Sequence, residues 1–163
     1  MSLDLFIPIR WIHVVSASVW VGEVAVINFI LIPVVGQLNV ASRRTFLTTV
    51  FPRVFRMASL LSSTAVVSGL TLLTMMTQGS FGVLLEGRWG NAILFGGTLG
   101  ILLTLFHFFM ENRLAKKIGV GCEYLPSDEQ LEDVHSKLKV VPRAGMLVIS
   151  TIFFSMMYAV RGV

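Results

Sequence analysis

The chain has 163 residues, of which 55% are hydrophobic and only 13% are charged, and its net charge is +4. This composition excludes an ordinary soluble domain, in which about 25% of the residues are charged. The single cysteine excludes an internal disulfide and any metal centre built from several cysteines.

Four apolar stretches are long enough to cross a bilayer, because a transmembrane helix needs about 20 mainly apolar residues. The predicted spans are residues 6–35, 52–76, 91–113 and 140–161. Pro52 and Pro142 are expected in the first turns of the second and fourth spans, where a missing N–H costs nothing. Residues 37–51 are predicted to form a short interfacial helix, and a short acidic helix is expected to begin after Ser127. The predicted fold is an all-α, integral membrane four-helix bundle that forms one domain.

Basic residues gather around the first and third connections between the spans. Ten of the 13 lysines and arginines lie there: Arg43, Arg44, Arg53, Arg56, Arg113, Lys116, Lys117, Lys137, Lys139 and Arg143. The positive-inside rule therefore predicts both connections in the cytoplasm and both termini on the extracytoplasmic side of the plasma membrane. Because these charges are topology signals, we expect the bilayer, and no nucleic acid, as a partner. Other membrane subunits or a second copy of the chain are further candidate partners.

Few ionisable side chains lie inside the predicted spans, and those away from the span ends include His13 and Glu23 in the first span and His107 in the third. Hydrocarbon penalises such side chains by roughly 2.5–3.5 kcal/mol, which makes them functional candidates. At about 1.5 Å per residue, His13 is expected in the outer half of the membrane and His107 in the inner half, roughly 15–20 Å apart. One metal ion or haem iron therefore cannot bind both histidines.

The outer predicted site pairs His13 with Met157 near the end of the fourth span. A histidine and a methionine form an axial pair for haem iron and a soft ligand set for Cu(I). Each residue also has a structural alternative. His13 can be a histidine that is hydrogen-bonded to a neighbouring helix and binds no ligand. Met157 can be an ordinary apolar side chain in contact with lipid or the core.

The inner predicted site combines His107 with Glu23 and Arg56, which fall at a similar depth. A cluster of this kind is suited to guiding protons or to holding anionic groups such as haem propionates or a quinone headgroup. The alternative is a static ion-pair network that holds the bundle together. A four-helix membrane bundle with inward-facing histidines is also the usual frame for b-type haem.

The segment WIHVVSASVWVG, from Trp11 to Gly22, resembles a known membrane pattern. It is similar to the His–x6–Trp–x–Gly opening of the superfamily that contains the bacterial haem-b protoporphyrinogen oxidases (HemJ-type) and the copper-resistance D-like proteins. The resemblance implies four membrane helices and a first-helix histidine that binds haem b or copper. That histidine maps to His13, and the tryptophan of the pattern maps to Trp20.

The likeness extends more weakly through Pro33, Trp89 and His107 and so covers nearly the whole chain. At the start of the third helix the oxidases carry a histidine and a lysine, whereas this chain reads Asn91-Ala92-Ile93-Leu94. The resemblance thus implies membership of the superfamily rather than protoporphyrinogen oxidation.

Three functions remain open on the sequence. The first is a haem b-binding membrane protein that takes part in electron transfer with a porphyrin or quinone, as a component of a membrane oxidoreductase. The second is a non-catalytic accessory subunit of a larger membrane complex, which agrees with the small size and the lack of a complete catalytic constellation. The third is copper uptake or handling.

Overall fold

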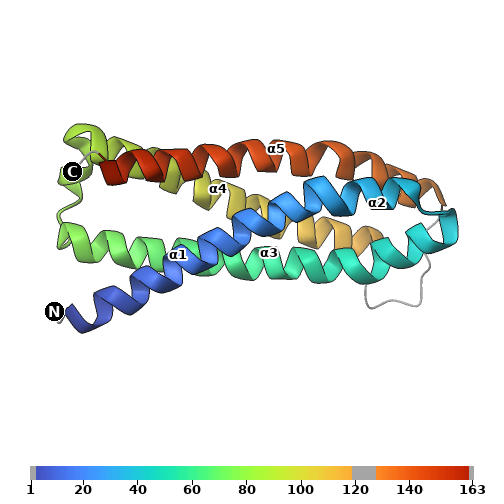
Figure 1. The fold of residues 1–163 in the computed structure, drawn as a ribbon, viewed down its shortest axis with the longest axis horizontal. Coiled ribbons are helices and arrows are strands. Elements are labelled where there is room, and N and C mark those ends of the chain that lie inside the picture. The colour runs from blue at the N-terminus through green and yellow to red at the C-terminus, as the bar shows by residue number, and fades with distance from the viewer. Residues whose placement is uncertain (1–2, 119–127, 162–163) are drawn as a thin grey trace.

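The computed structural model describes residues 3–118 and 128–161, and all the regular structure in these residues is helical (Figure 1). The elements are α1 (Leu3–Val26), the π-helix η1 (Ile27–Leu31), α2 (Ile32–Gln37), α3 (Val40–Thr77), the 3-10 helix η2 (Phe81–Leu85), α4 (Gly87–Ile118) and α5 (Asp128–Arg161). The first three follow one another without a break and form one long rod.

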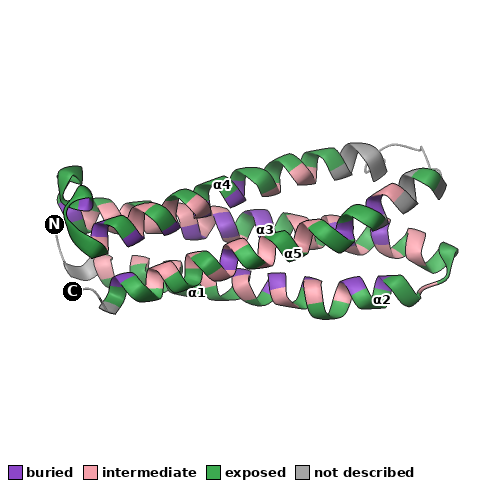
Figure 2. Cartoon of the chain, turned by 90° about the horizontal axis from the view of Figure 1, so that it is seen from above, coloured by how far each residue is buried: buried purple, intermediate pink, exposed green. Residues whose placement is uncertain are grey.

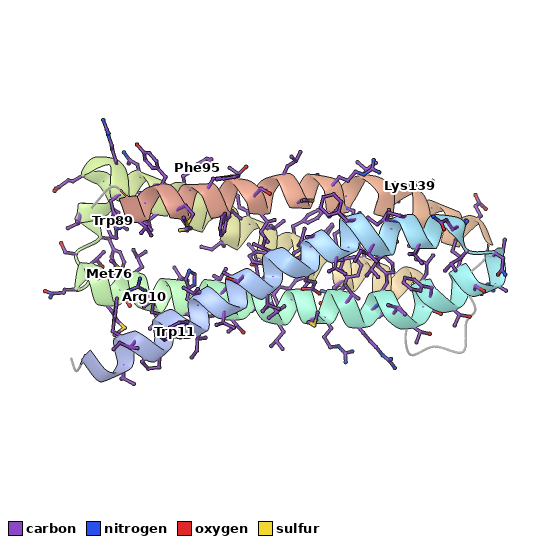
Figure 3. The ribbon with its side chains drawn as sticks, in the orientation of Figure 1. Arg10, Trp11, Met76, Trp89, Phe95 and Lys139 are labelled. Carbon is purple, nitrogen blue, oxygen red and sulfur yellow. The ribbon has the colours of Figure 1, made fainter. Side chains whose placement is uncertain are left out.

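Within residues 3–118 and 128–161, four helical segments are long and apolar enough to cross a membrane. They are Leu5–Gln37, Val40–Thr77, Gly87–Arg113 and Ser136–Val160. The predicted all-α fold with four candidate spans is therefore confirmed, as is a multi-pass association with a bilayer. Figure 3 shows Arg10, Trp11 and Trp89 towards the end of the bundle at which α1 begins, and Lys139 towards the opposite end.

The helices form a ring of neighbours in which α1 contacts α3 and α5, and α4 also contacts α3 and α5. Consequently α1 and α4 lie diagonally across the bundle. Figure 1 shows that α1 crosses at an angle, so that its first half lies near α3 and the rod approaches α5 only towards α2. Buried positions form narrow stripes, and much of the surface is exposed (Figure 2).

A proline lies just after the π-helix in the first span. Pro33 lacks a backbone N–H, and its ring crowds the carbonyl four residues earlier, which disfavours a regular α-turn. The wider turn of η1 at Ile27–Leu31 accommodates this disruption. Within η1, the Asn28 Nδ2 atom donates hydrogen bonds to the Val24 carbonyl at 2.8 Å and the Pro142 carbonyl at 3.0 Å. The side chain thereby ties the first span to α5.

The two proline-based helix starts are wrong, because Pro52 and Pro142 lie inside α3 and α5. Helix α3 begins earlier, where the Asn39 Oδ1 atom accepts a hydrogen bond from the Ser42 backbone N–H at 2.8 Å and caps the first turn. The predicted interfacial helix is therefore the first part of α3. The acidic helix is continuous with α5, and Ser127 lies outside the described residues.

Packing at the end of the bundle where α2 terminates explains why both helices continue through their prolines. We call this group the α2-end core, and it consists of Val35, Leu47, Phe51, Val134 and Leu138. A proline inside a helix costs about 3 kcal/mol. Burying one Leu or Phe side chain returns about 1.5–3 kcal/mol, so the buried residues around each proline offset its cost.

Candidate functional site

The outer histidine lies between α1 and α3. The His13 Nδ1 atom is 2.8 Å from the Ala65 carbonyl oxygen, and the Ser68 Oγ atom is 3.5 Å from the same nitrogen. Because a carbonyl oxygen only accepts, Nδ1 is the nitrogen that carries the hydrogen and donates it. In the neutral ring, Nε2 is then left with the free lone pair, which is the arrangement of a histidine that binds a metal through Nε2.

A glycine makes room for this ring. A Cβ atom built on Gly69 would lie 2.9 Å from the His13 Cε1 atom and 3.1 Å from Nδ1, closer than side chains pack. Gly69 therefore allows the imidazole to lie against the backbone of α3, one turn beyond the carbonyl that anchors it. His13 is half-buried there and faces the bundle as expected, together with Ala17 and Trp20 on the same side of α1.

Met157, the predicted partner of His13, lies on a different helix from the residues that bind the His13 ring. The Met157 side chain is 47% exposed on α5, whereas the hydrogen bonds of the His13 ring within the described residues go only to α3. The neighbouring Met156 packs towards α4 instead, since a Cβ atom on Gly96 would lie 2.9 Å from its Cε atom. The structure thus shows Met157 as a largely exposed residue, and within the described residues no hydrogen bond joins it to His13.

A second polar site lies at the centre of the bundle, where two diagonal helices meet. The ring centroids of Trp20 on α1 and His107 on α4 are 5.7 Å apart, in an edge-to-face contact. Trp20 also packs with Val24, Leu103 and Ile149 in an apolar core. Glu23 lies one turn beyond Trp20 on the same face of α1 and is only 7% exposed.

This second site has unusually few partners. Within the described residues, four of its buried atoms make no hydrogen bond: the Trp20 Nε1 atom, both carboxyl oxygens of Glu23, and the His107 Nδ1 atom. Arg56, expected here from the sequence, is exposed on α3 and makes no ion pair with the described part of the chain. The absence of partners for these four atoms argues against the alternative of a static ion-pair network. We call Trp20, Glu23 and His107 the central polar cluster.

One turn beyond His107 on α4, a carboxylate is held by a serine. The Ser59 Oγ atom of α3 donates a hydrogen bond of 2.6 Å to the Glu111 Oε2 atom. Ser59 itself is buried, and Glu111 is half-buried. Since residues four apart share a helix face, His107 and Glu111 line the same side of α4.

The two histidines lie at different depths. His107 contacts Trp20, and Trp20 follows His13 by seven residues, which is about 10 Å along α1. This placement agrees in direction with the predicted separation, although it is shorter. Within the described residues, no group of three histidine, cysteine, aspartate or glutamate side chains could hold a metal ion. His13 and His107 therefore belong to two separate sites.

Several contributors to these sites are not apparent from the sequence. The Ala65 carbonyl and Gly69 hold the His13 ring. Helix α3 contains many other small residues, so its sequence does not single out these two as partners of His13. Asn28 does carry a signal, because an amide inside an apolar span is as conspicuous as Glu23. Ser59 is recognisable as a small residue, and its hydrogen bond to Glu111 depends on how the helices pack.

A shallow groove between the start of α4 and the end of α5 contains neither histidine. Its lining includes Arg88, Asn91, Phe95 and Tyr158. His13 instead offers one imidazole nitrogen, Nε2, in the tautomer that would let it hold a metal such as haem iron. Comparisons of the chain with family models, with curated proteins and with solved structures find no match.

Proposed function

We propose that this chain is a multi-pass protein of the plasma membrane that binds haem b through His13 and takes part in electron transfer with a porphyrin or quinone. The observation that carries the proposal is the hydrogen bond of 2.8 Å from His13 Nδ1 to the Ala65 carbonyl, which leaves Nε2 for a ligand. The resemblance of the Trp11–Gly22 segment to the haem-binding superfamily supports the same role for His13.

Residues of α1 and α3 have separate roles in holding the haem. A bound haem supplies an iron that accepts and releases one electron. His13 holds the iron from α1, the Ala65 carbonyl orients the imidazole, and Gly69 leaves space for it. The surrounding apolar helices exclude water from the site. The basic residues at the opposite end of the bundle favour both termini on the extracytoplasmic side, so that His13 lies in the outer half of the membrane.

The experiment is a reduced-minus-oxidised absorption spectrum of the protein purified from membranes of cells supplied with haem. We expect b-type bands that are lost in His13→Ala and retained in the matched histidine variant His107→Ala. The absence of bands in the unmodified protein overturns the proposal. So does a result in which only His107→Ala loses them, because the iron would then belong to the central polar cluster.

One observation favours a second function, that of an accessory subunit in a larger membrane complex. Helix α5 is the least covered of the four candidate spans, and large apolar side chains such as Leu147, Phe154 and Val160 are more than 70% exposed on it. Either lipid or another membrane chain can cover such a face. Purification in mild detergent separates the two, since a subunit co-purifies with its partner in fixed proportion, whether that partner is a second copy or a different protein.

Copper handling gains no comparable support. It required a soft methionine beside His13, and the candidate Met157 is 47% exposed on another helix. Metal analysis of the purified protein tests this alternative directly. Copper bound in equal amount to the protein, and lost in Met157→Ala, would favour it over haem.

A further inference from the structure

The central polar cluster is not needed to hold a haem at His13, and it poses a separate physical question. Glu23 is only 7% exposed, and neither of its carboxyl oxygens has a hydrogen-bond partner within the described residues. Buried polar groups are nearly always paired, so each exception needs a cause. Here the cause lies in the charge state of the carboxyl group.

An ionised carboxylate in this position would have no compensation. On α3, the candidate cations Arg53 and Arg56 are exposed, and on α5 Arg143 is exposed. None of the three makes an ion pair with the described part of the chain. A lone buried charge is strongly disfavoured, whereas a neutral carboxylic acid is tolerated in an apolar interior. Glu23 is therefore stable in the bundle only while it carries a proton.

Among the described residues, the packed side chains near the level of Glu23 on its own span, α3 and α5 carry no charge, whereas α4 carries two titratable groups there. Trp20 and Asn28 come from its own span, Ser59 and Ser62 are buried on α3, and Pro142 and Met146 come from α5. Helix α4 contributes His107 and Glu111, the titratable groups of this level. The route by which a proton reaches Glu23 must therefore involve α4.

The spacing along the helices places these titratable groups at similar depths. Glu23 follows Trp20 by three residues, or about 4.5 Å, and Glu111 follows His107 by four residues, or about 6 Å, in helices that run the same way. The contact between Trp20 and His107 sets the common level. Glu111 lies nearer the end of the membrane segment of α4, and its half-buried carboxylate is fixed by Ser59.

We propose that Glu23 is a membrane-embedded proton-exchange site, whose carboxyl group holds a proton in the bundle interior and exchanges it with the inner end of the bundle through His107 and Glu111. This function does not depend on haem. When Glu23 gives up its proton, the O–H bond of Glu23 breaks and an N–H bond forms on His107. The imidazolium then passes its proton to the Glu111 carboxylate, which releases it to water as hydronium. Water molecules bridge each transfer, and the reverse sequence reloads Glu23.

The first test uses a hydrophobic carbodiimide, which reacts with protonated carboxyl groups inside membranes and leaves a stable adduct. The whole protein in phosphatidylcholine vesicles is treated at neutral pH, and adducts are located by peptide mass spectrometry. We expect labelling of Glu23 at least tenfold faster than that of Glu86, which is an exposed carboxylate of the outer loop. Equal or slower labelling of Glu23 overturns the proposal.

The second test measures the route. In infrared spectra, a protonated carboxyl gives a C=O band that shifts when the sample is moved into heavy water, and Glu23→Gln identifies the band of Glu23. We expect His107→Phe and Glu111→Gln each to slow that shift at least tenfold. Thr104→Val, on the same face of α4, is the matched control and leaves the rate unchanged. An unaltered rate in both variants overturns the route through α4.

Folding is monitored in the same samples. Glu23→Gln replaces one neutral group by another of the same shape, so we expect its circular dichroism spectrum and melting temperature to match those of the unmodified protein. A large loss of stability in Glu23→Gln shows that the carboxyl makes interactions which an amide cannot, and it overturns the neutral acid. Because no step requires a cofactor, these results are independent of whether His13 binds haem.

Discussion

Replacing Gly69 with alanine separates the orientation of His13 from the stability of the bundle. The new methyl group would lie 2.9 Å from His13 Cε1, so the ring must move and lose its hydrogen bond to the Ala65 carbonyl. That bond contributes about 1 kcal/mol. Alanine returns about 0.5–1 kcal/mol in helix propensity, so the free energy of unfolding should change by less than about 1 kcal/mol.

The affinity for haem should respond much more strongly. Loss of the group that orients a ligating histidine typically lowers metal affinity by about 10–100-fold. We expect this loss for Gly69→Ala when the haem-free protein is titrated with haem and followed by absorbance. Nitrogen chemical shifts of the ring, measured without haem, should change from the Nδ1–H tautomer to a mixture.

Gly97→Ala is the matched control, because a Cβ atom at Gly97 on α4 would meet nothing within 4 Å. It gains the same helix propensity without touching His13. If Gly69→Ala and Gly97→Ala bind haem equally well and keep the same tautomer, the assigned role of the α1–α3 contact is refuted.

Three further predictions concern stability and can be measured by denaturant or thermal unfolding in detergent. Ser59→Ala removes the hydrogen bond to a carboxylate on α4 and should cost about 1.5–3 kcal/mol, and a loss near zero would show that the carboxylate finds other partners. Phe51→Ala in the α2-end core should cost about 3–5 kcal/mol, whereas the same change at Phe154, which is 71% exposed, should cost far less. Gly90→Ala should destabilise the protein more than Gly97→Ala, because its Cβ atom would overlap the Leu84 carbonyl in the connection between α3 and α4, and equal melting temperatures would contradict this packing.

The sequence predicts the four spans because they depend on composition and length alone. Helix boundaries depend on more than local signals. Pro52 and Pro142 are good markers of helix starts in general, but Asn39 caps α3 thirteen residues before Pro52, and the α2-end core stabilises the extra turns. Tertiary packing overrode the local preference of proline.

The candidate sites also have one part that the sequence predicts and one part that depends on packing. An ionisable residue in an apolar span stands out from its neighbours, so His13, Glu23 and His107 can be selected from the amino-acid order alone. Their partners are a matter of helix register. The sequence cannot show that Gly69 lies opposite His13, or that Arg56 is exposed, because a rotation of α3 by one residue would change both. The predicted pairing of His13 with Met157 likewise depends on how α1 and α5 are placed, and the ring nitrogen of His13 is hydrogen-bonded to α3 instead.

The midpoint potential of the haem tests both proposals, because His13 and Glu23 are ten residues apart, or about 15 Å along the same helical rod. At an effective dielectric constant of about 20, a unit charge at Glu23 would change the energy of an electron at His13 by about 1 kcal/mol, or about 45 mV for a one-electron couple. If Glu23 is neutral, Glu23→Gln removes no charge and should leave the midpoint potential of the haem within about 10 mV of the original. A rise near the larger value would mean that a carboxylate had been removed, and Glu23 would then not be the proton carrier that its missing partners indicate.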